Sequence, residues 1–149
     1  MKKNNKGFSL VELIVVVLIM AIIAVALAPQ VMKWVDNSRI STDISNYDEM
    51  VANLQVAITD KDAYAVAIKE SPKVVVKIDL DGTTIDSKKS DDTNLNDIGK
   101  AMNSVAPGWD KIQKKCPANN TQNKNAYEIE IYNGGVFKSH PPVANSDLS

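Results

Sequence analysis

One acidic side chain, Glu12, lies inside a long apolar stretch near the start of the chain. Between Phe8 and Ala28 the only polar side chains are Ser9 and Glu12. A carboxylate removed from water is costly unless it has a partner, and the segment itself offers none. The partner is therefore expected from processing of this chain or from another chain.

Cleavage of the chain between Gly7 and Phe8 would create such a partner. The new α-amine on Phe8 would have a pKa of about 7.7–8.0 and be largely protonated. Glu12 would then lie four residues from a positive charge on its own chain, and the same charge on a neighbouring copy would be equally available. When two such helices pack together, the charges neutralise each other, and the acid sets the register of stacked identical chains.

Residues 8–28 are long enough to cross a membrane as a helix. These 21 residues rise about 31 Å, which matches a hydrocarbon core of about 30 Å. Lys2, Lys3 and Lys6 precede the segment and predict a cytoplasmic N-terminus, with the rest of the chain exported.

Two simpler interpretations compete with processing at Gly7. A secretory signal peptide would use the motif at residues 26–28, but Pro29 follows that bond and makes it a poor substrate for signal peptidase. A plain signal anchor explains the length and the lysines but not Glu12. The processed, stacking helix is favoured because it alone accounts for the acid.

Residues 2–29 resemble the class III leader of type IV pilins and related pseudopilins. A short basic leader ends in Gly7, and "FSLVELIVVVLIMAII" begins at Phe8 with Glu12 as its fifth residue. The resemblance implies that a membrane-embedded prepilin peptidase cuts after Gly7 and methylates the amine of Phe8, and that Glu12 is the assembly acid. Pro29 lies where the family commonly carries a helix-bending proline, so a kink is expected there.

The resemblance also implies an organisation and a role. Residues 1–7 would be the leader, 8–29 the transmembrane or filament-core half of the helix, and 30–149 the exported globular domain. The chain would leave the cytoplasmic membrane for a homopolymeric surface pilus in adhesion, twitching motility or biofilm formation, with an inner assembly platform and a separate ATPase motor. A pseudopilin of a type II secretion or DNA-uptake system, or an anchored binding domain that never polymerises, are the alternatives.

The pattern after Pro29 predicts that the helix continues to about Thr59 and becomes amphipathic. Apolar residues recur every three or four positions, at Ile40, Ile44, Tyr47, Val51, Leu54 and Ile58. The polar residues Asp43, Asn46, Asp48, Glu49 and Asn53 lie off this stripe. The stripe is expected to pack against a sheet.

Two short helices and two hairpins are predicted beyond the long helix. Residues 60–71 form a helix with Asp60 as N-cap, and residues 95–105 form another with Asn94 as N-cap, after which Trp109 docks into the core. Residues 73–87 alternate about a turn at Asp81-Gly82, and residues 127–139 alternate about a turn at 133–135. The expected fold class is α+β and pilin-like, a long N-terminal helix packed on a small antiparallel sheet.

The rest of the sequence gives little sign of catalysis or ligand binding. A net charge of −1 without a basic stripe argues against nucleic-acid binding. Asp79 and Asp81 lack the further ligands of a calcium loop, and His140, the only histidine, is expected at the surface of a strand end. No metal site, cofactor or enzymatic activity is therefore expected.

Cys116 is the only cysteine, so the chain cannot form an internal disulfide. Many pilins hold their C-terminal region with a cysteine pair, and this chain departs from that pattern, which leaves open how its C-terminal loop is fixed. Cys116 is either an incidental cysteine in a polar loop or a thiol that reacts or pairs between chains. The residues from Pro141 onward are expected to form a surface tail.

Overall fold

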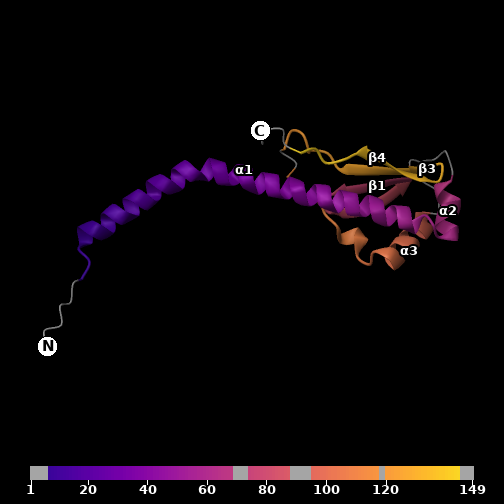
Figure 1. Cartoon of the computed structure of the whole chain (residues 1–149), viewed down its shortest axis with the longest axis horizontal. Helices are drawn as coiled ribbons and strands as arrows, with labels where there is room; N and C mark the ends of the chain where they lie inside the picture. The colour runs from indigo at the N-terminus through magenta and orange to yellow at the C-terminus, as the bar shows by residue number, and fades with distance from the viewer. Residues whose placement is uncertain (1–6, 69–73, 88–94, 118–119, 145–149) are drawn as a thin grey trace, which may run out of the picture. The chain divides into compact units, whose positions relative to one another are not determined.

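The computed structural model describes residues 7–68, 74–87, 95–117 and 120–144. The chain forms two compact units, one up to Asp36 and the other from Asn37 onward, and each is described by itself. In chain order the elements are α1 (Leu10–Ala57), α2 (Lys61–Ala67), β1 (Val74–Asp79), β2 (Gly82–Ser87), α3 (Leu95–Val105), the 3-10 turn η1 (Trp109–Lys111), β3 (Tyr127–Tyr132) and β4 (Gly135–His140) (Figure 1).

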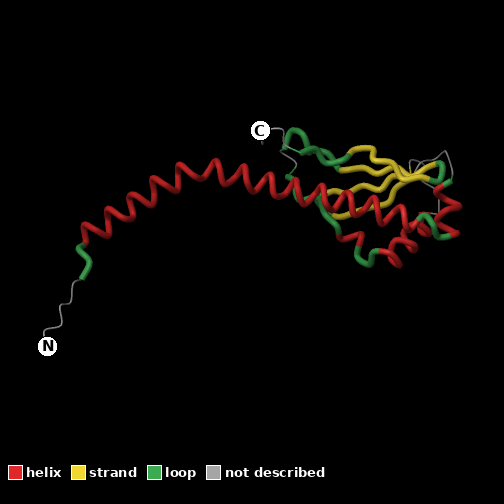
Figure 2. Tube along the Cα trace, viewed as in Figure 1, coloured by secondary structure: helices red, strands yellow, loops and turns green. Residues whose placement is uncertain are grey.

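Helix α1 contains 48 residues and includes Pro29 in its interior. Figure 2 shows it as one continuous helix. Every residue from Gly7 to Val35 is exposed in the monomer. Within the described residues, α1 is the one helix that is long and apolar enough to cross a membrane. The backbone is helical on both sides of Pro29, and the kink expected there stays a prediction.

The second half of α1 packs on a small sheet, which confirms the predicted α+β fold. The strand order is β2-β1-β3-β4, and each neighbouring pair is antiparallel. One face of β3 is buried through every second residue, as the alternation predicts. The core between helix and sheet contains Tyr47, Met50 and Leu54 of α1, Val74, Val76 and Ile78 of β1, and Tyr127, Ile129 and Ile131 of β3.

The first hairpin is present, but its turn lies one residue earlier than predicted. Asp79 pairs with Gly82, so the turn residues are Leu80 and Asp81, and the predicted Asp81-Gly82 turn is wrong. Gly82 has a φ of +139°, and a Cβ on it would lie 2.9 Å from the carbonyl oxygen of Asp110. The glycine therefore serves the close approach of η1 to β2.

The second hairpin turns at Asn133 and Gly134, whose φ angles of +48° and +72° suit a tight two-residue connection. Gly135, predicted as part of the turn, already pairs with Tyr132 as the first residue of β4. The backbone N–H of Gly134 donates to the carbonyl oxygen of Ala67 at 2.8 Å, so this turn is attached to the end of α2.

The predicted helix cap and the docked tryptophan are confirmed. The carboxylate of Asp60 accepts the backbone N–H groups of Asp62 and Ala63, at 3.0 and 3.3 Å, and so caps α2. Trp109 is partly buried against the core, and its Nε1 donates to Asn103 Oδ1 at 3.0 Å. Helix α2 ends at Ala67, with Ile68 as its C-cap, so it is shorter than the helix predicted over 60–71. The N-cap predicted at Asn94 lies outside the described residues.

Candidate functional site

The peptide bond between Gly7 and Phe8 lies before the first helical residue. Residues 7–9 have no regular structure, and α1 begins at Leu10. Phe8 is 86% exposed, and nothing lies within 4 Å of the place where a Cβ on Gly7 would stand. A protease can therefore reach this bond without unwinding a helix.

Glu12 has a partner within its own segment, contrary to the prediction that the segment offers none. Its Oε2 accepts the backbone N–H of Ser9 at 2.9 Å. Ser9 directly precedes the helix and Glu12 is its third residue, which is the acid-to-cap bond of a capping box. The Ser-x-x-Glu spacing was the signal that could have revealed this contact. The partial positive charge of a helix N-terminus also favours an acid here.

The carboxylate of Glu12 keeps capacity for a second donor. An ionised carboxylate has about four acceptor positions, and the N–H of Ser9 uses one of them. Phe8 directly precedes Ser9, so an amine created at Phe8 would arise beside the N–H that Glu12 already accepts. The same carboxylate is equally open to an amine from another chain.

Apart from Glu12, the first part of α1 presents apolar side chains in all directions. An all-round apolar helix is typical of a membrane span or of a helix covered by other protein. The side chains exposed by 46–77% in this stretch are Leu10, Val11, Leu13, Ile14, Val15, Val16, Val17, Leu18, Ile19, Met20, Ile22, Ile23, Val25 and Leu27.

Asp43 is buried on the face of α1 that meets the rest of the globular unit. It was predicted to lie off the buried stripe, and that prediction is wrong, because only 2% of Asp43 is exposed. Its Oδ1 accepts the backbone N–H of Lys115 at 2.6 Å. Its Oδ2 accepts the N–H of Cys116 at 2.8 Å and the hydroxyl of Tyr127 at 2.9 Å. One carboxylate thus ties the segment before β3, and β3 itself, to the long helix.

The surroundings of Asp43 keep Tyr127 in its neutral form. Burial raises the pKa of Tyr127, and the hydrogen bond to Asp43 and the negative charge of that carboxylate raise it further. Lys114 lies on the same ring, with its Nζ 5.3 Å from the ring centre, and donates to the carbonyl oxygen of Asn125 at 3.0 Å. Polar contacts therefore fix residues 114–116 on two sides. The N–H groups of Lys115 and Cys116 donate to Asp43, and Lys114 donates to Asn125.

Asn123 fixes the chain after β4 in a similar way. Its Nδ2 donates to the carbonyl oxygen of Val143 at 2.9 Å, and its Oδ1 accepts the N–H of Val143 at 2.8 Å. Only 2% of Asn123 is exposed. The first part of the expected surface tail is thus bonded to the globular unit, and Asp43 and Asn123 hold the C-terminal region without a disulfide.

Cys116 and His140 differ in their exposure. Cys116 is completely buried, so a bond between its thiol and another chain would need local opening of this segment. His140 is the last residue of β4 and its side chain is 66% exposed, which confirms the predicted surface position. Its Nδ1 lies 3.4 Å from Glu128 Oε2.

Comparison with known families identifies the N-terminal segment. Residues 2–28 match the family model described as the prokaryotic N-terminal methylation motif. This motif is the class III leader of type IV pilins and pseudopilins, so the chain carries the leader of that class of protein. The leader implies processing by prepilin peptidase and the use of pilus-type assembly machinery, and with the apolar helix it fits a membrane-anchored precursor. Searches of curated proteins and of solved structures found no match.

Proposed function

We propose that the chain is the structural subunit of a type IV pilus. Prepilin peptidase cuts it after Gly7 and methylates the amine of Phe8. The precursor stays in the cytoplasmic membrane with its N-terminus inside, and an assembly platform and a separate ATPase then move it into the filament. The observation that carries this proposal is the first part of α1, which apart from Glu12 is apolar on all sides and is uncovered from Leu10 to Leu27.

Packing between copies of α1 would supply the cohesion of the filament. Leaving lipid for a filament core removes no water from these side chains, so close packing and polar contacts must hold the helices together. Glu12 contributes the polar contact by accepting the Phe8 amine of a neighbouring copy while it keeps the N–H of Ser9. The pair fixes how far one helix is shifted along the next.

The filament would serve adhesion, twitching motility or biofilm formation, as its family resemblance implies. Pseudopilins of type II secretion and DNA-uptake systems share the leader, and electron micrographs of long surface filaments would separate the two roles. The chain is proposed as a structural protein, with the peptidase and the motor ATPase as separate partners.

The first experiment is the intact mass of the protein recovered from membranes and from sheared surface material. The proposal predicts the mass of residues 8–149 plus one methyl group. A mass that begins at Met1 in sheared filaments would overturn processing at Gly7. A mass that begins at Pro29 would instead identify a secretory signal peptide.

The second experiment separates charge pairing from helix capping. Glu12→Gln keeps an oxygen that can accept the N–H of Ser9 but removes the negative charge that the Phe8 amine needs. We expect normal insertion and cleavage but a large loss of assembled filament. Glu49→Gln removes an exposed acid elsewhere on the same helix and serves as the matched control. Filaments at the control level from Glu12→Gln would rule out the pairing role.

A further inference from the structure

The exposed apolar surface of α1 continues beyond Pro29. Val31, Met32 and Val35 are exposed by 46%, 69% and 43%, and Trp34 by 60%. These residues belong to the first unit, which ends at Asp36. A large apolar surface on a monomer marks contact with lipid or with another protein.

The charges on the two sides of this surface are spaced to match a bilayer. Between Glu12 and Lys33 no side chain is charged. Leu13 to Met32 is 20 residues, which rise about 30 Å as a helix, the thickness of a hydrocarbon core. A span over residues 8–28 is only one residue longer, but it would place Glu12 about 6 Å inside the hydrocarbon and Trp34 about 9 Å outside it.

The start of α1 also favours the later span. The first N–H groups of any helix have no acceptor within the helix and need water or a capping group. Because α1 begins at Leu10, a span over residues 8–28 would bury these groups in hydrocarbon, where unpaired backbone groups are not tolerated. A span that begins at Leu13 leaves them, and the Ser9–Glu12 hydrogen bond, in the headgroup layer.

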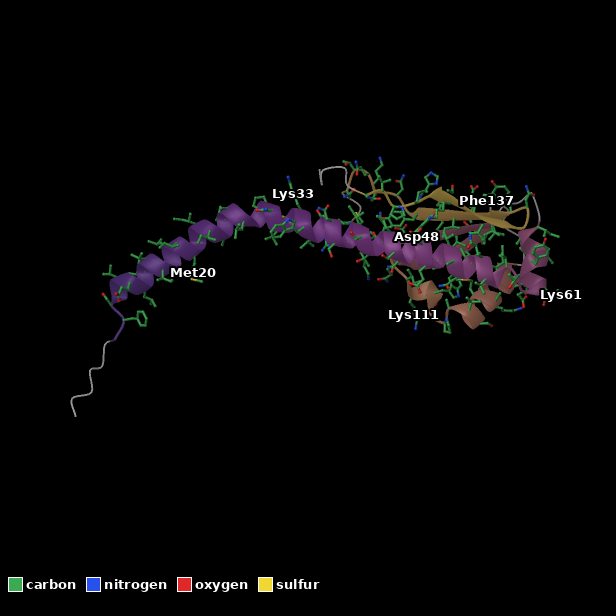
Figure 3. All side chains as sticks on the ribbon, in the orientation of Figure 1. Met20, Lys33, Asp48, Lys61, Lys111 and Phe137 are labelled. Carbon is green, nitrogen blue, oxygen red and sulfur yellow. The ribbon has the colours of Figure 1, made fainter. Side chains whose placement is uncertain are left out.

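The other end has the residue types that favour a membrane surface. Trp side chains concentrate where hydrocarbon meets headgroups, and Lys side chains extend from there toward water. Lys33 and Trp34 follow Met32 directly, and Figure 3 shows the Lys33 side chain extending away from the helix. Gln30 lies only two residues from this end, within reach of the headgroups.

We propose that in the precursor the lipid bilayer covers Leu13–Met32, with Glu12 at the inner surface and Lys33 and Trp34 at the outer surface. This assignment rests on the membrane stage of the proposed function and not on filament assembly. Relative to residues 8–28, it moves the inner end of the span about 7.5 Å and the outer end about 6 Å along the helix. Glu12 is then an acid of the membrane surface before assembly, and its transfer to a dry filament core is a later step.

The test measures the depth of Trp34 in the full chain, reconstituted in phosphatidylcholine vesicles whose acyl chains are brominated at known positions. Trp109→Phe leaves Trp34 as the only tryptophan. If Trp109→Phe does not fold, Trp34→Phe supplies a Trp109 signal to subtract from that of the wild type. We expect blue-shifted emission of Trp34 and strongest quenching by bromines near the ester end of the acyl chain.

Two results would overturn the assignment. Trp34 emission at a wavelength typical of water, quenched by acrylamide but by no brominated lipid, would mean that the span ends near Ala28. Strongest quenching by bromines near the chain methyl end would place Trp34 inside the hydrocarbon. Leu27→Trp in the double variant Trp34→Phe/Trp109→Phe calibrates depth, because residue 27 should lie about 10 Å deeper. A misplaced Trp34 combined with normal processing at Gly7 would refute this span and leave the pilus proposal intact.

Discussion

Asp43→Asn tests how the globular unit holds its C-terminal half. The carboxylate accepts three hydrogen bonds with two oxygens, two from the backbone N–H groups of Lys115 and Cys116 and one from the hydroxyl of Tyr127. Asparagine has the same shape but only one oxygen, so its NH₂ group must face one of the two backbone N–H groups. At least one buried donor then loses its acceptor, whichever way the amide turns.

The expected loss of stability follows from these contacts. A buried donor without an acceptor costs about 1–3 kcal/mol, and the bonds that remain lose the strength that a charged acceptor gives them. Together we expect a decrease of about 2–4 kcal/mol in the free energy of unfolding, a large share of the roughly 5–15 kcal/mol typical of a whole domain. The variant should remain folded but clearly weakened.

Two measurements check this prediction on the full chain in mild detergent. Urea unfolding followed by Trp109 fluorescence, in a Trp34→Phe background, gives the change in free energy, with Asp48→Asn as the control. Asp48 is an exposed acid of the same helix that pairs with Lys138 at the surface, and such pairs contribute roughly 0–1 kcal/mol. Labelling of the buried Cys116 thiol reports local opening, and its rate should rise about 30- to 1,000-fold in Asp43→Asn. Equal effects of the two substitutions, or an unchanged labelling rate, would refute this account of Asp43.

Three further predictions concern the globular unit. Gly82→Ala should destabilise it by about 1–3 kcal/mol, because the new Cβ would meet the Asp110 carbonyl, whereas Gly108→Ala, with positive φ but open space, should cost about 1 kcal/mol in the same urea assay. Burial raises the pKa of Tyr47 from 10.0 to about 12, because it favours the neutral hydroxyl. The stability that depends on this neutral form is complete below pH 10 and is lost as the pH rises through about 12. The free energy of unfolding, measured by circular dichroism at alkaline pH, should therefore decrease less steeply with pH in Tyr47→Phe than in the wild type. The difference in slope should be up to about 1.4 kcal/mol per pH unit. Asn123→Ala should speed proteolytic removal of the residues after β4, detected by mass, because both bonds to Val143 are lost.

The elements with a local pattern were predictable from the sequence. Ile98 and Met102 lie four residues apart and are buried in α3, and Asp60 stands at the N-cap position of α2. The first hairpin was found from its Asp-Gly pair, but the turn is formed by the two residues before Gly82. That glycine is needed for the approach of Asp110, which is far along the chain, so no local signal could place it correctly.

Within α1 the difficulty was a choice between two overlapping faces. Positions 40, 47 and 54 belong to both of two possible stripes. The first stripe also contains positions 44, 51 and 58, and the second contains positions 43, 50 and 57. Residue type favours the first, since Ile44, Val51 and Ile58 are apolar. The structure buries most of both sets, but in the first turn it buries Asp43 and leaves Ile44 only partly covered. Spacing alone allowed Asp43 on the buried face, and polarity argued wrongly against it.

The two unexpected acids of α1 differ in where their partners lie. Glu12 bonds to a backbone N–H three residues away, so its Ser-x-x-Glu spacing contained the answer. The donors to Asp43 lie 72, 73 and 84 residues away, and two of them are backbone N–H groups that no residue type can reveal. A buried acid without a basic partner is stable only where several donors converge on it. Asp43 therefore obtains all of its hydrogen-bond donors within one folded unit. Glu12 would obtain a further donor from a second chain, when the amine of another copy joins the N–H of Ser9 that its carboxylate already accepts.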